Sequence, residues 1–369
     1  MLREMHLVWP EAPVFVLFHD RARAHPAFRD WTVRTSWMQT LPGATRQYRW
    51  YLPVMPAATE SHDLRDFDVI LSSSSAFSKG VITHPEAIHI SYCHTPTRFL
   101  WTDTHSYVEE LQYPRIVKTL LPPVLNYLRV WDRQAAERVD RFIANSETVR
   151  RRIQKYYGRD ADVIHPPVDV HNHPFPPYHK GEARGLSLGQ YYLVGGRLVA
   201  YKRFDLVVRA FSRLGVPLKV FGEGPELERL RAMAKSNVEF IGRVTDDEKR
   251  LLYAGCTAFI NPQVEDFGIT AVEAMAAGRP VIAYPEGGAL ETVIPGVTGE
   301  FLEDQTWENL AHHVIRFDVA RFDATRIREH AETFDAVHFR ARLKAYVDHA
   351  YAERETVRRR GQLAIPLAV

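Results

Sequence analysis

The segment from Glu265 to Glu273 combines two acids with a glycine, in the order Glu-Asp-Phe-Gly-Ile-Thr-Ala-Val-Glu. Gly268 lets a ligand approach the backbone closely, and the free amides of residues 268–270 at a helix start attract an anion. Glu273 lies in an otherwise apolar run, where a carboxylate needs a partner such as the hydroxyls of a ribose. Glu265 precedes the helix and can face the same ligand. The segment predicts a phosphate and sugar site; the alternative is a loop acid followed by a structurally paired acid.

A second candidate segment, Gly195 to Phe204, follows an apolar strand and contains both glycines and cations. The glycines, Gly196 among them, leave room at the strand end. Arg197 and Lys202 can neutralise a diphosphate, which matters because breaking a sugar–phosphate bond leaves negative charge on the nucleotide. The alternative is that both are ordinary surface cations.

Two glycine turns and one histidine complete the candidates. The turns around Gly222 and at Gly287-Gly288 suit either the close approach of a ligand or a tight turn. His94 follows the apolar strand Ile88–Cys93, and side chains at the carboxyl ends of parallel strands face the ligand in doubly wound sheets. His94 can bond a transferred sugar or stabilise a cationic transition state; the alternative is a structural histidine.

The elements that must position these residues alternate between strand and helix along the chain. Such alternation implies right-handed crossovers and parallel sheets, and short apolar strands fit sheets covered on both faces. The fold class is therefore α/β, with two doubly wound domains facing a cleft for two substrates. The predicted strands are 14–18, 68–71, 88–93, 141–144, 163–165, 191–194, 218–221, 238–241, 257–260 and 280–284, and the predicted helices are 124–139, 147–157, 204–214, 225–234, 246–254 and 269–277.

A stretch dense in proline and histidine divides the two halves of this pattern and predicts a linker. We expect a first domain at 1–168, the linker at 169–189, a second domain at 190–333, and a helical segment at 334–369 that packs back toward the first domain. No metal site is predicted, since His171 and His173 in the linker are too weak a candidate.

Composition excludes several classes of protein. The 369 residues carry 47 basic and 45 acidic side chains, a balance that argues against a nucleic-acid binder. We predict a cytoplasmic protein on three grounds. The two cysteines are distant in sequence, the chain has no apolar run long enough to span a bilayer, and its start does not resemble a signal peptide. Aromatic and cationic residues mix at 31–38 and 46–51, which suits peripheral contact with the inner face of a membrane; the alternative is partly buried tryptophans in ordinary loops.

Together these segments resemble family 4 of the retaining glycosyltransferases, which have the GT-B fold of two Rossmann-like domains. The resemblance spans about residues 65–305 and rests on the order and spacing of the motifs. Tyr92-Cys-His-Thr-Pro96, with Trp101 and Asn145-Ser146, is most similar to bacterial mannosyltransferases of O-antigen and exopolysaccharide synthesis. The other motifs are Gly195-Gly-Arg197 with Lys202, Phe221-Gly-Glu-Gly-Pro225, Gly242-Arg-Val-Thr245, Glu265 with Glu273, and Gly287-Gly288.

The resemblance implies a role for each matching residue. The first domain would face the acceptor, and the second would bind the nucleotide sugar. Arg197 and Lys202 would grip the donor diphosphate, Glu265 and His94 would contact the donor sugar, and Glu273 would bind the ribose. The implied catalytic residues are His94, Glu265, Arg197 and Lys202, and the implied donor-binding residues are Gly196, Gly222, Arg243, Val244, Phe267, Gly268, Ile269, Thr270 and Glu273.

The implied activity is metal-independent transfer of a hexose, with no cofactor, from GDP-mannose to a glycan or polyprenyl-linked acceptor in cell-envelope polysaccharide synthesis. The acceptor would attack the face that the nucleotide leaves, and a donor phosphate oxygen would take the proton. Three alternatives stay open: a UDP-hexose donor, a non-catalytic scaffold that binds nucleotide sugar, and an isomerase acting on a nucleotide sugar.

The chain departs from the family at its start. Members begin with a strand, a glycine-rich turn and a helix before the region that matches residues 1–5. We therefore expect the N-terminal domain to lack its first strand, which would expose apolar surface at a sheet edge.

Overall fold

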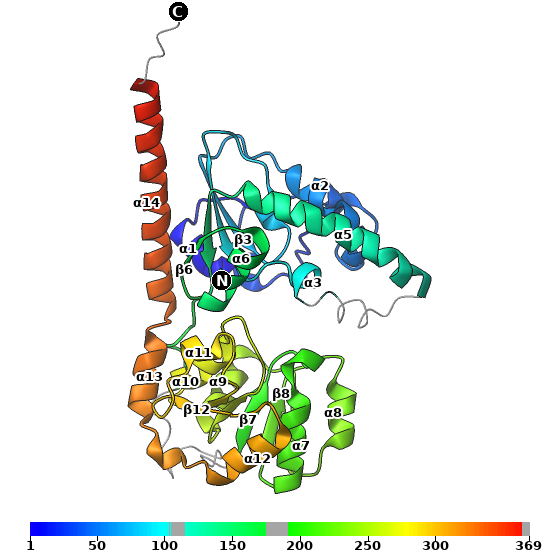
Figure 1. The fold of residues 1–369 in the computed structure, drawn as a ribbon, viewed down its shortest axis with the longest axis vertical. Coiled ribbons are helices and arrows are strands. Elements are labelled where there is room, and N and C mark those ends of the chain that lie inside the picture. The colour runs from blue at the N-terminus through cyan, green and yellow to red at the C-terminus, as the bar shows by residue number, and fades with distance from the viewer. Residues whose placement is uncertain (103, 105–114, 175–190, 364–369) are drawn as a thin grey trace, which may run out of the picture. The chain divides into compact units, whose positions relative to one another are not determined.

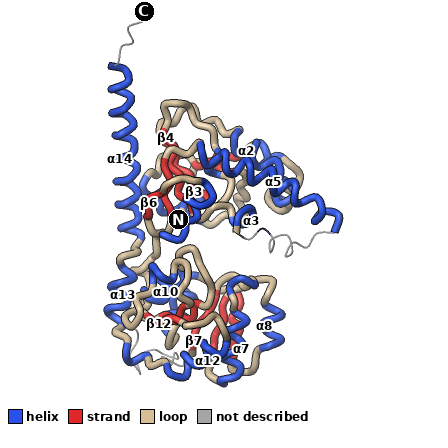
Figure 2. Tube along the Cα trace, in the orientation of Figure 1, coloured by secondary structure: helices blue, strands red, loops and turns tan. Residues whose placement is uncertain are grey.

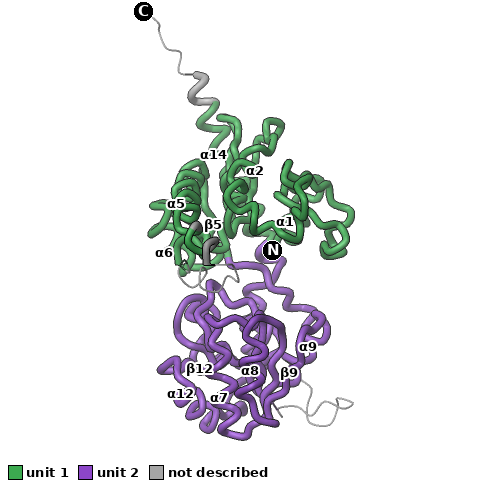
Figure 3. Tube along the Cα trace, turned by 90° about the vertical axis from the view of Figure 1, so that its right-hand side faces the viewer, with its two compact units in different colours: residues 1–164, 340–369 green, residues 165–339 purple. Residues whose placement is uncertain are grey.

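The structure is a computed structural model that describes residues 1–102, 104, 115–174 and 191–363 (Figure 1). It divides into two compact units. Unit 1 contains Met1–Ile164 and Arg340–Val369, and unit 2 contains His165–Phe339 (Figure 3). The chain therefore leaves unit 1 once and returns to it at its end. Residues 175–190, which make up much of the predicted linker, lie outside the described residues.

Unit 1 contains a four-stranded parallel sheet, in the order β3-β4-β5-β6, and a separate parallel pair, β1-β2. Helix α1 (Leu2–Val8) is the first described element, and β1 follows it. Every residue of β4 is buried, as expected for a central strand of a covered parallel sheet. The strands are β1 (Val14–Val16), β2 (Val33–Thr35), β3 (Val69–Ser74), β4 (Ile88–Cys93), β5 (Arg141–Ala144) and β6 (Ala161–Val163).

Helices α5 and α6 pack on this sheet through a shared apolar cluster that also contains residues of β4 and β5. Helix α6 begins at its cap Ser146, whose hydroxyl accepts a bond from the amide of Val149, and ends at Gly158 in a left-handed conformation. The last helix joins unit 1 through a bond from the Tyr346 hydroxyl to Asp162, 2.8 Å long. The helices are α2 (Met55–Glu60), α3 (Arg98–Trp101), α5 (Arg115–Glu137), α6 (Glu147–Tyr157) and α14 (Ala336–Leu363).

Unit 2 contains a six-stranded parallel sheet in the order β12-β11-β10-β7-β8-β9. Its strands are drawn in red in Figure 2, where β7 and β12 are labelled. The chain builds outward from β7 through β8 to β9, and then from β10 through β11 to β12 on the other side. The strand order therefore reverses between β7 and β10. The strands are β7 (Tyr192–Gly195), β8 (Leu218–Phe221), β9 (Val238–Gly242), β10 (Phe259–Asn261), β11 (Val281–Ala283) and β12 (Gly299–Phe301).

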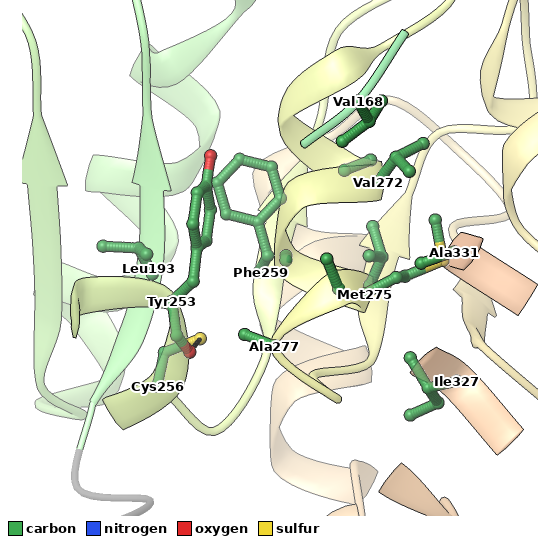
Figure 4. Close-up of a cluster of buried hydrophobic side chains, with 14 of the residues drawn as sticks. Val168, Leu193, Tyr253, Cys256, Phe259, Val272, Met275, Ala277, Ile327 and Ala331 are labelled. Carbon is green, nitrogen blue, oxygen red and sulfur yellow. Dashed lines mark hydrogen bonds between the residues drawn. The ribbon is translucent and has the colours of Figure 1, made fainter. Parts of the chain in front are cut away.

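Apolar clusters cover both faces of the six-stranded sheet. One cluster joins Leu193 and Phe259 to α10 and α13 (Figure 4), and the other joins Val194 and Ile260 to α7 and α12. Neighbouring residues of one strand thus face opposite helical layers, as strand geometry requires. The helices are α7 (Phe204–Leu214), α8 (Leu227–Met233), α9 (Asp246–Gly255), α10 (Ile269–Ala276), α11 (Ala289–Thr292), α12 (Trp307–Arg316) and α13 (Ala324–Glu332).

Several element bounds differ from those that the sequence predicts. Strand β3 continues through three serines to Ser74, because these residues pair in register with Ser91–Cys93 of β4 even though serine has little strand preference. Strand β6 ends at Val163 rather than His165, and β10 is shifted to Phe259–Asn261. Among the helices that the structure describes, none is both long and apolar enough to cross a bilayer.

Candidate functional site

The reversal of strand order in unit 2 places two loops side by side. Strand β7 ends at Gly195 and β10 ends at Asn261, and the two strands are neighbours in the parallel sheet. Ligands of doubly wound sheets bind beyond the carboxyl ends of the strands at such a switch point. The loop after β7 carries Arg197 and Lys202, and the loop after β10 carries Glu265. Topology therefore brings two of the predicted segments to one edge of the sheet.

Lys202 and Glu265 form an ion pair at this edge, with 3.0 Å between Nζ and Oε1. The two side chains are 13% and 22% exposed, so a solvent-facing ligand can reach both. The side-chain amide of Gln263 donates to the same Glu265 oxygen at 3.0 Å. A side chain at Gly196 would come within 3.1 Å of the Lys202 ammonium, so the glycine leaves that space open.

The glycine turns hold these two loops in place. A Cβ on Gly222 would lie 1.8 Å from the Gly196 carbonyl oxygen, and a Cβ on Gly287 would lie 2.3 Å from the Glu265 carbonyl oxygen. Gly288 also donates its amide to the Glu265 carbonyl at 2.8 Å. Both turns therefore pack directly on site loops, and glycine is required there for close backbone contact. The backbone of Gly196 already fills the space beside Gly222.

Two hydrogen bonds through Gln305 also connect the loop after β7 with the loop after β10. The guanidinium of Arg203 donates to Gln305, and the Gln305 amide donates to the carbonyl of Pro262. Arg203 has φ 53°, the only positive value among the described residues other than glycine. A left-handed arginine carries backbone strain, and such strain clusters at functional sites. The strained turn directly follows Lys202.

Helix α10 opens toward the same edge. Its cap is Gly268, with φ 89°, a conformation that glycine adopts without steric cost. Phe267 is buried against the His165 ring, with 5.2 Å between ring centroids, which fixes the entry into the helix. Ile269 is exposed and Thr270 is half-buried. The amides of residues 268–270 stand at the helix start, where the helix dipole favours an anion.

Glu273 lies one turn into α10, and its carboxylate is held from α9. The Lys249 ammonium donates to Oε1 at 2.9 Å, and the Tyr253 hydroxyl donates to Oε2 at 3.1 Å. Burial, with the neighbouring Glu273 charge, raises the pKa of Tyr253. Burial alone lowers the pKa of Lys249, but the charges and hydrogen bonds of Glu273 and Asp246 together outweigh it, and the net shift is upward. The acid is thus structurally paired, as the alternative interpretation held, and its oxygens keep further lone pairs for a ligand.

The remaining predicted residues of unit 2 lie at the surface of its loops. Arg197 and Arg243 are exposed, and Val244 packs partly against the core. Arg197 makes no ion pair with any residue that the structure describes.

His94 belongs to unit 1 and directly follows β4. Its Nε2 lies 2.9 Å from the Ser73 hydroxyl, and its backbone amide donates to the Ser74 carbonyl. Its ring meets Tyr92 edge-on, with 5.4 Å between centroids. These contacts hold the imidazole at the carboxyl end of the sheet, where the sequence predicts it.

Sequence reasoning missed two polar residues at the end of β10. Asn261 and Gln263 are fully buried, and Gln263 holds Glu265. The signal in the sequence is two amides that interrupt an apolar strand, in Phe259-Ile-Asn-Pro-Gln263.

Comparisons with known proteins agree with this architecture. A family model described as "Glycosyltransferase Family 4" matches residues 11–172, and one described as "Glycosyl transferases group 1" matches residues 189–332. D-inositol 3-phosphate glycosyltransferases of Mycobacterium bovis and Mycobacterium tuberculosis are 29% identical to the chain over 231 residues. That match covers 56% of this chain and 48% of each relative, so the chain spans about half the length of these curated relatives.

Two solved structures share the fold over nearly the whole chain. HepE of Anabaena, solved with UDP and glucose, has a TM-score of 0.69 at 19% identity and covers 94% of both chains. Sucrose-phosphate synthase of Thermosynechococcus elongatus has a TM-score of 0.71 at 17% identity, with 95% of this chain and 92% of that chain covered. The two family models together account for most of both units, and the chain belongs to glycosyltransferase family 4 and has the two-domain GT-B fold.

Proposed function

We propose that this chain is a retaining glycosyltransferase that moves a hexose from a nucleoside diphosphate sugar to a glycan or polyprenyl-linked acceptor of the cell envelope. The observation that carries the proposal is the grouping of Lys202, Glu265 and the start of α10 at the switch point of one parallel sheet. Membership of glycosyltransferase family 4 supports the reaction class.

Positive charge at the switch point suits the donor diphosphate. Lys202, Arg197 and the amides of residues 268–270 neutralise the charge that develops on the leaving nucleotide, which lowers the barrier to breaking the sugar–phosphate bond. Glu273 accepts hydroxyls of the ribose while Lys249 and Tyr253 keep its carboxylate in place. The backbone near Arg243 and Val244 meets the base.

The transfer step needs no metal and no cofactor. The bond from the anomeric carbon to the diphosphate oxygen breaks, and the acceptor oxygen bonds to the same face of that carbon. The acceptor proton passes to a phosphate oxygen of the leaving diphosphate. Glu265 holds hydroxyls of the hexose in place, and His94 supplies a further hydrogen bond to the sugar.

GDP-mannose is the donor that we propose first, because the Tyr92-Cys-His-Thr-Pro96 segment is similar to that of mannosyltransferases. A UDP-hexose is the second candidate. The specific observation in its favour is that HepE has been solved with UDP and with UDP-glucose.

Isothermal titration of the full chain with GDP, UDP, GDP-mannose and UDP-glucose tests the proposal. We expect one nucleoside diphosphate to bind and the Glu273→Ala variant to bind it at least tenfold more weakly, because a hydrogen bond to a charged group is worth about 1.5–3 kcal/mol. Glu239→Ala is the matched control, since Glu239 is a 60%-exposed acid of the same unit, and it should bind like the unchanged chain.

Transfer of labelled hexose to a membrane extract is the second readout. A chain that binds a nucleotide sugar but transfers no hexose would support the scaffold alternative. A chain that interconverts the donor without transfer would support the isomerase alternative. A chain that binds none of the four nucleotides would overturn the proposal itself.

We also propose that unit 1 contacts an anionic membrane surface, where a lipid-linked acceptor resides. Residues 46–50, Arg-Gln-Tyr-Arg-Trp, line a surface hollow of about 300 Å³. Trp50 is 57% exposed and Trp37 is 46% exposed, while Met38 of the same aromatic segment is buried. Exposed rings beside cations suit the boundary between headgroups and acyl chains.

Sedimentation with vesicles tests this contact. We expect the chain to pellet with vesicles rich in phosphatidylserine at low salt and to stay in the supernatant at high salt, because the attraction is electrostatic. The Arg46→Ser, Arg49→Ser double variant should lose this binding. Arg65→Ser serves as the control, since Arg65 is an exposed arginine of the same unit paired with Asp63. Equal sedimentation of all variants would contradict the assignment of the surface.

A further inference from the structure

Asn261 ends β10 with a fully buried side chain whose amide has no partner among the described residues. Neither its nitrogen nor its oxygen forms a hydrogen bond with another described group. A buried polar group without a partner destabilises a fold, and native proteins satisfy nearly all such groups. The chain therefore carries an unpaired donor and an unpaired acceptor on one side chain.

The amide of Asn261 lies close to the cap of α10, at the edge of the candidate site. Side chains alternate along a strand, so Asn261 faces the same helical layer as Phe259, which packs with α10 (Figure 4). Its nitrogen and the Cβ of Glu265 lie 3.9 and 4.0 Å from the point where a Cβ on Gly268 would stand. The amide nitrogen and the Glu265 side chain thus both lie beside the cap of α10.

A second buried amide stands two residues later with one atom unpaired. The Gln263 oxygen has no partner among the described residues, while its nitrogen holds Glu265. Two buried amides with three unpaired polar atoms therefore directly precede the acid that is proposed to bind the hexose. The Asn261 amide offers both a donor and an acceptor, and the Gln263 oxygen offers a further acceptor. This set matches hydroxyls, whereas a phosphate oxygen can only accept.

We infer that Asn261 and Gln263 are hexose-specificity residues, whose amides hydrogen-bond hydroxyls of the donor sugar. This inference rests on the proposed function. A donor diphosphate competes with Glu265 for Lys202, so its binding loosens the Lys202–Glu265–Gln263 chain that now occupies this edge. The loop from Gln263 to Gly268 then opens toward the sugar, and the buried amides gain their partners.

The Asn261→Leu variant tests the inference, because leucine has nearly the shape of asparagine without its polar atoms. Replacing an unpaired buried amide by an apolar group removes a cost, so we expect the midpoint of thermal unfolding without nucleotide to stay the same or rise. We expect the affinity for the nucleoside diphosphate to change less than threefold. The affinity for the nucleotide sugar should fall about tenfold, as for the loss of one or two hydrogen bonds.

Asn237→Leu is the matched control. The Asn237 amide donates to the carbonyls of Phe211 and Val216, so this variant should unfold at a lower temperature and keep both affinities. Gln263→Leu is a second variant with the same expected loss for the nucleotide sugar, and it serves if Asn261→Leu does not fold.

The outcomes separate the inference from the proposed function. If the unchanged chain binds neither nucleoside diphosphate nor nucleotide sugar, the proposed function fails and the inference fails with it. If the unchanged chain binds both and the Asn261→Leu and Gln263→Leu variants keep the same ratio of affinities, the inference alone is overturned. A lowered unfolding midpoint with that unchanged ratio would assign the amide to a trapped water.

Discussion

Glu265 holds Lys202 in an ion pair at the same edge where the proposed diphosphate binds. The carboxylate repels a diphosphate and competes with it for the ammonium. We therefore expect Glu265→Gln to bind the nucleoside diphosphate about threefold to tenfold more tightly while losing at least tenfold in transfer rate. Titration at low and high salt, with single-turnover transfer, measures both. Weaker diphosphate binding in this variant would show that Glu265 supports the diphosphate site instead of opposing it.

His89, buried in β4, makes stability depend on pH. Burial, with the charge of Arg138, lowers the pKa of His89 to about 3, below the value of about 6.5 in an unfolded chain. The unfolded chain therefore binds more protons than the folded chain between these values, so stability is present at pH 7 and is lost as the pH falls through this window. We expect a loss of about 1–2 kcal/mol from pH 7 to pH 5.

The His89→Gln variant should remove most of that dependence, because glutamine does not titrate. His349→Gln is the control, since the His349 side chain is 71% exposed on α14. Thermal unfolding at pH 7, 6 and 5 measures the slope. A His89→Gln variant that loses stability as steeply as the unchanged chain would assign the dependence to other groups.

At the scale of elements, one buried aspartate ties four segments of unit 1 together. Asp132 of α5 pairs with Lys79, and both side chains are 1% exposed. The same carboxylate accepts bonds from Thr97, Trp101 and Tyr157, each at 2.7–2.8 Å. Thr97 lies three residues after His94, so this cluster also fixes the loop that carries the histidine.

Removing only the acid of this cluster should lower the free energy of unfolding more than removing both members of the ion pair. Asp132→Leu leaves the Lys79 ammonium buried without its charge partner, which costs about 3–5 kcal/mol. The Lys79→Met, Asp132→Leu double variant buries no charge, so it should be less destabilised than the sum of the single variants. Urea unfolding of the full chain tests this cycle. Additive losses would show that the two charges do not depend on each other.

Helices that end at a glycine could be predicted from sequence. The predicted bounds of α6 and α7 are confirmed, because Gly158 and Gly215 end the two helices in left-handed conformations. Strand β12 escaped prediction because it is three residues long and pairs with β11, a contact that no local pattern encodes. The grouping of Lys202 with Glu265 follows from the order of the strands in the sheet. The strand order does not tell which face of β10 carries Asn261.

At the scale of the whole molecule, each unit has its own sheet and its own apolar clusters. The residues proposed to bind the diphosphate all belong to unit 2. A ligand stabilises the unit that binds it, by about 2.7 kcal/mol at a concentration 100 times its Kd. We therefore expect calorimetry of the full chain to show two unfolding transitions. The nucleoside diphosphate should raise the midpoint temperature of only one of them.

Variants of the two units identify which transition moves. Asp132→Leu should lower the midpoint temperature of the unit 1 transition, and Asn237→Leu should lower that of the unit 2 transition. Each change removes buried contacts within one unit. The nucleotide should raise the same midpoint temperature that Asn237→Leu lowers, and Glu273→Ala should abolish this rise. A single transition would mean that the units unfold together, so that binding in unit 2 stabilises the loop carrying His94 as well. An equal rise of both transition temperatures would contradict binding by unit 2 alone.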